Sequence, residues 1–184
     1  MYREAVPAHR RQDPEGSIFK LPNVPGHESM AAEMISDTTM SVRVRDAIAA
    51  NEFPPAFYSH PIVVQNKGLA LPLSIYIDGV PYSRTDTTIG FWLQNIVTGV
   101  RHLMISFRKN LACKCGCRGW CSYDAILRVI HWVVQSLCLG FFPHTRHDNE
   151  DWEPDFDDVR KSIAGSAMKM KCFILFVKGD WSEY

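Results

Sequence analysis

The chain has 184 residues and a formal net charge of zero, because 20 basic residues balance 20 acidic ones. This balance argues against strong non-specific binding to nucleic acid, although a local basic patch can persist in a neutral chain. No run of about 18 apolar residues is present, so no membrane-spanning segment is expected. Residues 1–16 also lack the apolar centre of a secretion signal, so we expect an intracellular protein, with the nucleus as one alternative.

The first part of the chain predicts an arm rather than a folded core. Residues 1–37 contain four prolines and few apolar residues at regular spacing, which is typical of a flexible or extended segment. A short helix is predicted within residues 38–52, capped by Thr38 or Thr39. The connector that follows could hold a short strand at 62–65. We therefore take residues 1–70 as an N-terminal arm with a short helix.

Three strands are predicted between residues 71 and 109. Residues 73–78 and 101–109 alternate apolar and polar side chains, and residues 87–97 are rich in apolar and β-branched types. The intervening segments, 80–86 and 98–99, are typical of turns. Strands joined by such short turns form an antiparallel meander.

Two helices and a final strand are predicted after the meander. The first helix begins near Ser122, and its apolar residues are spaced by three and four: Leu127, Ile130, Val134, Leu137 and Phe141. The second is expected over residues 154–169, with four apolar residues facing inward: Phe156, Val159, Ile163 and Ala167. The last strand, 172–178, is apolar on both faces, which predicts a central strand covered on both sides.

The order β-β-β-α-α-β predicts an α/β domain with a mixed sheet over residues 71–184. A right-handed helical crossover can place the last strand parallel to the first. Asp78 ends the first of these two strands and Asp180 follows the last, so both would lie at one mouth of the sheet, where such folds gather ligands. Two carboxylates there could bind Mg²⁺ or Mn²⁺, with Asp86 or Glu183 as a third ligand. The alternative is that Asp78 begins a turn and Asp180 caps a helix.

Four of the six cysteines fall within residues 113–121, and they are Cys113, Cys115, Cys117 and Cys121. In an extended segment the first three point to one side, and Gly116 and Gly119 allow turns that bring the fourth round. Four thiolates are the ligands of a structural zinc ion. The block lacks two well-separated CxxC motifs, so free thiols and a disulfide or redox role are alternatives. Further potential ligands are Cys138, His102, His144 and His147.

Basic residues surround this cysteine block, and Trp120 lies among them. They could follow a phosphate backbone while the indole ring stacks on a base, which makes nucleic acid a candidate partner. A solvated surface would explain the same pattern. The residues are Arg101, Arg108, Lys109, Lys114 and Arg118.

The meander, the crossover and the two aspartates resemble the ribonuclease H-like superfamily, which includes integrases and DDE-type transposases. In that family the first strand carries an aspartate, matched by Asp78, and the fourth strand carries or precedes a second, matched by Asp180. The resemblance implies a Mg²⁺- or Mn²⁺-dependent nuclease with these two residues as catalytic metal ligands. The family's third acid lies on a later helix. The chain ends at Tyr184, so we expect a fold that is incomplete at its C-terminus.

Three segments, residues 75–92, 113–121 and 178–184, also resemble a multicopy set of algal proteins of mobile-element origin. The leading hypothesis is therefore a transposase- or integrase-like nuclease with little or no turnover. The second is a non-enzymatic module, stabilised by zinc, that binds nucleic acid or protein. The third is a structural subunit or homo-oligomer in which another chain completes the edge of the sheet.

Overall fold

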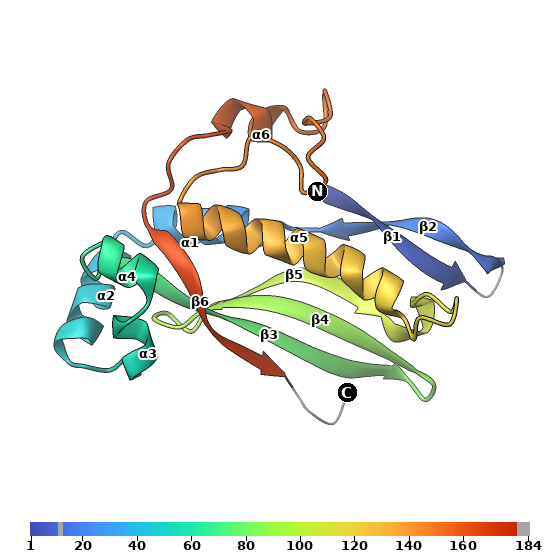
Figure 1. The fold of residues 1–184 in the computed structure, drawn as a ribbon, viewed down its shortest axis with the longest axis horizontal. Helices are drawn as coiled ribbons and strands as arrows, with labels where there is room; N and C mark the ends of the chain where they lie inside the picture. The colour runs from blue at the N-terminus through green and yellow to red at the C-terminus, as the bar shows by residue number, and fades with distance from the viewer. Residues whose placement is uncertain (11–12, 180–184) are drawn as a thin grey trace.

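The computed structural model describes residues 1–10 and 13–179 (Figure 1). Over these residues the chain is a mixed α/β protein with a four-stranded sheet and a separate two-stranded hairpin. The strands are β1 (Tyr2–Arg10), β2 (Asp13–Asn23), β3 (Ala70–Ser83), β4 (Asp86–Asn95), β5 (Arg101–Arg108) and β6 (Lys171–Gly179). The helices are α1 (Gly26–Ser36), α2 (Met40–Ala49), α3 (Pro55–Tyr58), α4 (Pro61–Gln65), the short 3₁₀ helix η1 (Lys109–Leu111), α5 (Trp120–Leu139) and α6 (Asp158–Ile163).

The four-stranded sheet has the order β5-β4-β3-β6. Strands β3, β4 and β5 are antiparallel neighbours, which confirms the predicted meander. The chain then crosses over through α5, and β6 returns parallel to β3, with Ala70 opposite Lys171 and Ile77 opposite Gly179. The parallel return of the last strand beside the first was also predicted and is confirmed.

The main core lies between this sheet and α5. Ile126, Ile130 and Val133 of α5 are buried together with Leu93 and Ile105 of the sheet. The β1–β2 hairpin lies beside α5 (Figure 1), and the N–H of Val24 donates to the carbonyl of Met104 at 3.0 Å. A second, smaller core forms where α2, α3 and α4 meet the beginning of β3 and β6.

The prediction that residues 1–37 form a flexible or extended arm is wrong in separating them from the folded core. These residues form the β1–β2 hairpin and α1, and five of them belong to the main core: Tyr2, Val6, Leu21, Met30 and Met34. Every second residue of β1 points inward, as a half-buried strand requires. Glu4 occupies one of these inward positions and interrupts the apolar pattern, so the sequence does not show a clean apolar alternation here.

The short helix expected within residues 38–52 is confirmed as α2, with Thr39 at its N-cap position. Its buried residues are Met40, Val44 and Ala47. The short strand expected at 62–65 is wrong, because Pro61–Gln65 is helix α4. Pro61 favours this outcome, since its fixed φ suits the first turn of a helix.

The helix predicted from Ser122 is present as α5, but Gly119 is its N-cap and Ser122 lies inside the first turn. The predicted apolar stripe is only partly correct, because Leu127 is 38% exposed and Phe141 is 49% exposed. The helix predicted over residues 154–169 is much shorter in the structure, where only α6 is helical in this range. Phe156 and Val159, predicted to face inward, are 70% and 75% exposed.

Strand β6 lies at the edge of the sheet, so the prediction of a central strand covered on both sides is wrong. Its first half is buried through Cys172 and Phe173, whereas Val177 in its second half is 70% exposed. An apolar run cannot distinguish a strand flanked by two others from an edge strand whose beginning is covered by helices. Among the described residues, no helix combines the length and the apolar character needed to cross a membrane.

Candidate metal centre

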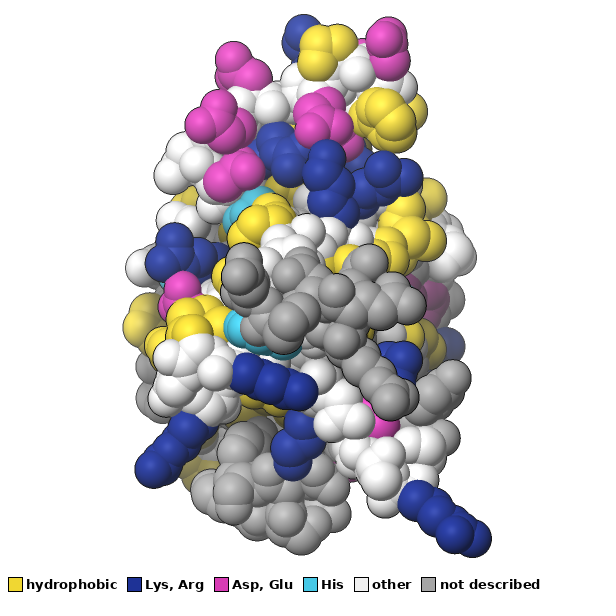
Figure 2. Space-filling view, turned by 90° about the vertical axis from the view of Figure 1, so that its right-hand side faces the viewer, with side chains coloured by type: hydrophobic (Ala, Val, Ile, Leu, Met, Phe, Trp, Pro, Cys, Tyr) yellow, Lys and Arg dark blue, Asp and Glu magenta, His cyan; other side chains and the backbone are white. Residues whose placement is uncertain are grey.

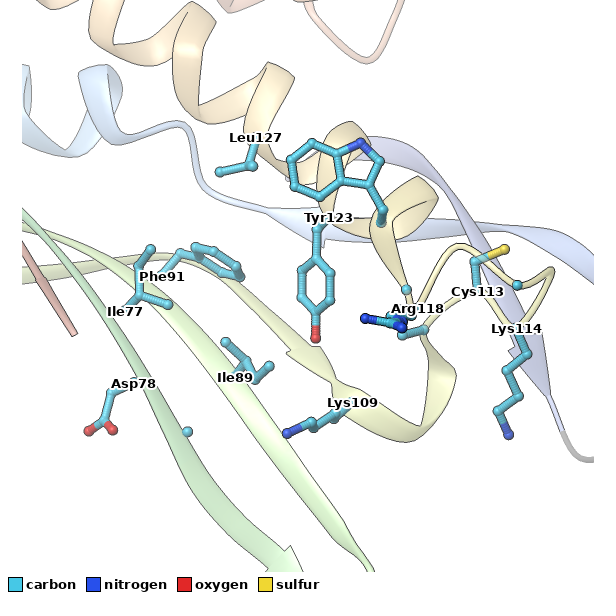
Figure 3. Close-up of a pocket in the computed structure, with 15 residues that line it drawn as sticks. Ile77, Asp78, Ile89, Phe91, Lys109, Cys113, Lys114, Arg118, Tyr123 and Leu127 are labelled. Carbon is cyan, nitrogen blue, oxygen red and sulfur yellow. The ribbon is translucent and has the colours of Figure 1, made fainter. Parts of the chain in front are cut away.

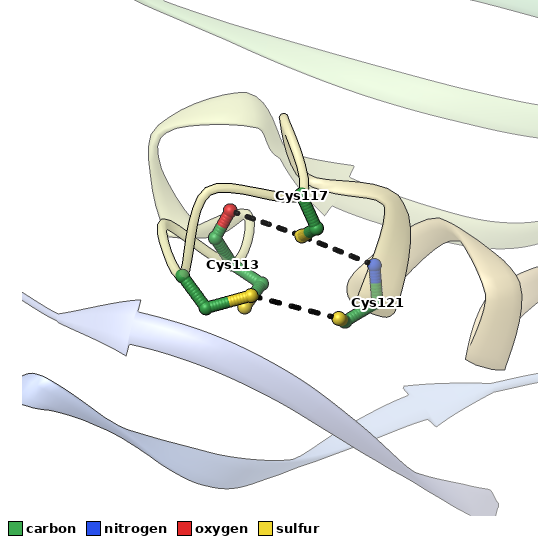
Figure 4. A group of neighbouring side chains, drawn as sticks. Cys113, Cys117 and Cys121 are labelled. Atoms are coloured by element: carbon green, nitrogen blue, oxygen red, sulfur yellow. Dashed lines mark hydrogen bonds between the residues drawn. The ribbon is translucent and has the colours of Figure 1, made fainter.

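The four cysteines of the 113–121 block converge at one end of the molecule. Cys113, Cys115 and Cys117 lie on the loop that leads from η1 to α5, and Cys121 lies in the first turn of α5 (Figure 4). Their sulfur atoms all lie within 4.8 Å of one another. In the described part of the chain, this is the only group of three or more Cys, His, Asp or Glu residues placed to hold a metal ion.

The distances between the sulfur atoms suit a tetrahedral ion. Zinc–sulfur bonds of about 2.3 Å place two ligands of a tetrahedron about 3.8 Å apart. The Sγ atoms of Cys115 and Cys121 are 3.8 Å apart, and all six cysteines are free thiols. The loop therefore needs only small movements of its other sulfur atoms to complete a four-thiolate site.

The backbone of the loop turns sharply to bring the fourth sulfur back to the first three. Gly116 has a φ of +96° and Gly119 a φ of +87°, in the left-handed region that favours glycine. At Gly119 a Cβ atom would also lie 3.1 Å from the Cβ of Ala112. The tight turns that the sequence predicted at these two glycines are therefore confirmed. At Gly119 the nearby Ala112 also leaves little room for a side chain.

Hydrogen bonds from outside the block hold the loop in place. The N–H of Cys113 donates to Ser122 Oγ at 2.8 Å, and the Ser122 hydroxyl donates to the carbonyl of Pro7. The N–H of Lys114 donates to His9 Nδ1 at 3.0 Å. Sequence reasoning missed the roles of Ser122 and His9 here, because no local pattern connects β1 with a loop about a hundred residues later.

Without a metal ion the four thiols do not ionise equally. The backbone N–H of Cys121 donates to Cys117 Sγ at 3.4 Å, and together with the neighbouring thiols it lowers the pKa of Cys117 to about 6. Hydrogen bonding to Cys117 and then to Cys115 raises the pKa of Cys121 to about 12. One thiolate is thus already favoured at neutral pH, and a bound cation would favour the other three by its charge.

The other potential ligands named from the sequence lie elsewhere. His102 Nε2 is 2.6 Å from Glu33 Oε2, and His147 Nε2 is 2.6 Å from Glu4 Oε2. Cys138 lies near the opposite end of α5. Neither these residues nor His144 belongs to the four-cysteine group.

The predicted carboxylate site lies partly outside the described residues, so only Asp78 and Asp86 can be placed. Asp78 lies within β3 opposite Gly90, and β3 continues to Ser83, so the prediction that Asp78 ends the strand is wrong. Its carboxylate accepts a hydrogen bond from the Tyr76 hydroxyl at 2.8 Å. Asp180 and Glu183 lie outside the described residues, which end at Gly179.

Asp86, one of the two candidates for a third metal ligand, lies at the start of β4 in the β3–β4 hairpin. Its buried carboxylate accepts from Arg108 Nε at 2.7 Å and from the N–H of Asn110 at 3.1 Å. Burial alone would raise the pKa of Asp86, but these hydrogen bonds outweigh it and hold the pKa below its ordinary value. The carboxylate is therefore fully engaged by the protein itself.

The predicted basic set divides between two locations. Arg108 pairs with Asp86, and the guanidinium of Arg101 lies 5.1 Å from the ring centre of Tyr76. Lys109, Lys114 and Arg118 instead line a cavity beside the cysteine loop. Figure 2 faces this end of the molecule and shows most acidic side chains in the upper part, whereas Lys and Arg side chains are spread from the top to the bottom of the view.

The cavity is the feature of the site that sequence reasoning missed. It has a volume of about 720 Å³ and lies between the β3–β4 hairpin, η1, the cysteine loop and the beginning of α5 (Figure 3). Residues that are far apart in the sequence form it, such as Ile77 and Tyr123. Only the positions of Trp120 and the basic residues next to the cysteines could have indicated it in advance.

Comparison with known proteins adds no family assignment. The chain matches no protein family, no curated protein and no solved structure. The fold and the site therefore define only a broad class: a mixed α/β protein with a clustered four-cysteine group suited to a metal ion.

Proposed function

We propose that this chain is a zinc-stabilised, non-enzymatic binding module. The observation that carries the proposal is the convergence of four cysteine sulfur atoms within 4.8 Å of one another. Cys113, Cys115, Cys117 and Cys121 hold the ion, and the cavity beside them is the binding surface. Sulfur-rich tetrahedral sites are typical of structural zinc.

The donor set favours a structural role for the ion over a catalytic one. Catalytic zinc sites keep one coordination position open for water or substrate. Here four thiolates fill the tetrahedron, so no position is left for a reacting group. The contribution of the ion is folding energy, because it joins the loop to the start of α5.

The ion also shapes the binding surface. Cys113, Gly116 and Gly119 belong both to the loop and to the lining of the cavity. Fixing the loop with zinc therefore fixes one wall of the cavity, and the hydrogen bonds of Ser122 and His9 extend this order to β1.

The test is metal analysis of the full chain purified without chelator. We expect one zinc ion per chain and loss of that zinc in the double variant Cys117→Ser/Cys121→Ser. Cys138→Ser is the matched control, because Cys138 is a half-buried thiol of the same helix outside the group. A metal-free protein with four thiols that react freely with a thiol reagent would contradict the proposal.

A second candidate is the ribonuclease H-like nuclease, and the observation that favours it is the sheet. An antiparallel meander followed by a parallel strand beside the first one matches the expectation stated for that superfamily. Under this proposal Asp78 and Asp180 are remnants of a metal site with little or no turnover. Mg²⁺- or Mn²⁺-dependent cleavage of DNA or RNA that is lost in Asp78→Asn would show an active enzyme instead.

A third candidate is a subunit that another chain completes. It rests on β6, which is the edge of the sheet and exposes Phe176 and Val177. Uncovered apolar edge strands invite pairing with another strand. Sedimentation at increasing micromolar concentrations tests it: a second copy would associate through β6, and Val177→Lys would weaken that association. A monomer throughout would argue against it.

A further inference from the structure

The four sulfur atoms of the cysteine group differ in what surrounds them. The Sγ atom of Cys117 donates to the carbonyl of Cys113 at 3.8 Å and accepts from the N–H of Cys121 at 3.4 Å. Cys113 is buried, and its N–H donates to Ser122 Oγ. Backbone groups and α5 therefore hold Cys113 and Cys117 in place.

Cys115 and Cys121 form a facing pair. Their Sγ atoms lie 3.8 Å apart, and a dashed line to Cys121 marks this contact in Figure 4. Cys115 is exposed, whereas Cys121 is half-buried in the first turn of α5. A disulfide bond is about 2.05 Å long, so the two sulfur atoms need to approach each other by about 1.8 Å to be joined.

The loop next to Cys115 has room for this movement. Gly116 follows it with a φ of +96°. A Cβ atom at Gly116 would meet no heavy atom of the described residues within 4 Å. The side chain of Cys115 can therefore turn toward Cys121 without displacing its surroundings, and a small oxidant can reach its sulfur from solvent.

We propose that Cys115 and Cys121 are an oxidation site, at which a hydroperoxide forms a disulfide and thereby releases the zinc ion. The inference rests on the proposed function, because the ion that is released is the zinc of that proposal. It deepens that function by naming how the site is regulated.

The reaction has two steps. The thiolate of Cys115 attacks one oxygen of hydrogen peroxide, so that an S–O bond forms, the O–O bond breaks and hydroxide leaves. The thiolate of Cys121 then attacks this sulfur, so that the S–S bond forms, the S–O bond breaks and a second hydroxide leaves. Two electrons pass from the two sulfur atoms to the peroxide, and each hydroxide takes a proton from the solvent. A dithiol reverses the oxidation by thiol–disulfide exchange.

Oxidation removes two of the four ligands of the ion. Cys113 and Cys117 remain, and two thiolates do not complete the tetrahedron of a structural zinc site. The loop then loses the ion that joins it to α5. Arg118 lies in this loop with a φ of +55°, which is uncommon for a residue other than glycine, and it also lines the cavity. Release of the ion lets this turn relax, so oxidation alters one wall of the binding surface.

The test is peptide mapping of the full, zinc-containing chain after treatment with hydrogen peroxide. Trypsin cleaves after lysine and arginine, which separates residues 115–118 from residues 119–128. We expect these two peptides to be joined, and their fragment spectra should place the bond at Cys115 rather than at Cys117. A chromogenic chelator should record one zinc ion released for each disulfide formed. Dithiothreitol should separate the peptides and restore zinc binding.

Three variants identify the role of each thiol. Cys121→Ser removes the second thiol, so dimedone should trap the sulfenic acid at Cys115. In Cys115→Ser, dimedone should leave Cys121 unmodified. Cys138→Ser is the control, because Cys138 is a half-buried thiol of the same helix outside the group, and it should give the same disulfide and the same zinc release as the unchanged protein. Circular dichroism checks the fold of each variant, and the map of the unchanged protein does not depend on any of them.

The outcomes separate this inference from the proposed function. A zinc-containing sample in which peroxide forms no disulfide, or joins Cys117 to Cys121 instead, overturns the inference alone. A disulfide between Cys115 and Cys121 that leaves the zinc bound overturns it as well. A sample purified without zinc contradicts the proposed function, and the peptide map then still decides the pair: a bond between Cys115 and Cys121 supports the oxidation site, and any other result overturns it.

Discussion

The backbone N–H of Cys113 donates a hydrogen bond to the Oγ atom of Ser122 at 2.8 Å, and both residues are buried. The Ser122 hydroxyl in turn donates a hydrogen bond to the carbonyl of Pro7. A single serine in α5 thereby connects the cysteine loop with β1. The folded domain therefore contributes to holding the loop through these two hydrogen bonds.

Ser122→Ala should destabilise the protein, because it leaves the buried N–H of Cys113 and the carbonyl of Pro7 without this partner. An unsatisfied buried polar group costs about 1–3 kcal/mol, and we expect a loss of unfolding free energy in that range by chemical denaturation. Zinc affinity should fall as well. Ser162→Ala is the control, since Ser162 is exposed on α6 and its removal should change stability by less than about 0.5 kcal/mol. Equal effects of the two variants would contradict this role for Ser122.

Asp86→Asn distinguishes a structural carboxylate from a metal ligand. The change removes the charge that pairs with Arg108, so we expect a loss of about 1–3 kcal/mol in unfolding free energy. The loss should be the same with and without Mg²⁺. Because the pKa of Asp86 is depressed in the fold, its contribution is present above its unfolded pKa and disappears as the pH falls below that value. A stabilising effect of Mg²⁺ that vanishes in Asp86→Asn would show a metal site instead.

His27 gives the fold a dependence on pH in the mildly acidic range. The side chain is buried, its ring centre lies 4.7 Å from that of Trp132, and burial followed by the charge of Arg160 lowers its pKa to about 3. The unfolded chain therefore binds a proton between pH 6.5 and about 3 that the folded chain does not, so stability falls as the pH falls through this window.

His27→Leu should remove this dependence, because leucine is of similar size and does not titrate. Between pH 7 and pH 5 the unchanged protein should lose about 2 kcal/mol more unfolding free energy than the variant. Denaturation curves at the two pH values measure the difference. His131→Leu is the control, because His131 is exposed on α5. Parallel losses in the unchanged protein and in His27→Leu would contradict a buried neutral imidazole.

The sheet was predictable because its signal is local. Leu73, Ile75 and Ile77 alternate with polar residues, and a meander needs only short turns between strands that follow one another. The β1–β2 hairpin was not predicted, because the residue at its core position, Glu4, lies against His147, which is far away in the sequence. Pairing over that separation leaves no trace in the local pattern.

The same distinction applies to the site. The spacing of Cys113, Cys115 and Cys117 indicated their convergence, since alternate residues of an extended segment share a side. The cavity could not be derived in this way. Its floor joins Ile77 with Leu127, two positions that the crossover through α5 brings together only in the folded chain.

The central claim is that four cysteine thiolates hold a zinc ion, and X-ray absorption at the zinc edge of the full chain tests it most directly. The account predicts a spectrum with four sulfur neighbours at about 2.3 Å and no nitrogen or oxygen neighbour. A protein without zinc, or zinc bound by a mixture of sulfur with nitrogen or oxygen atoms, would contradict it.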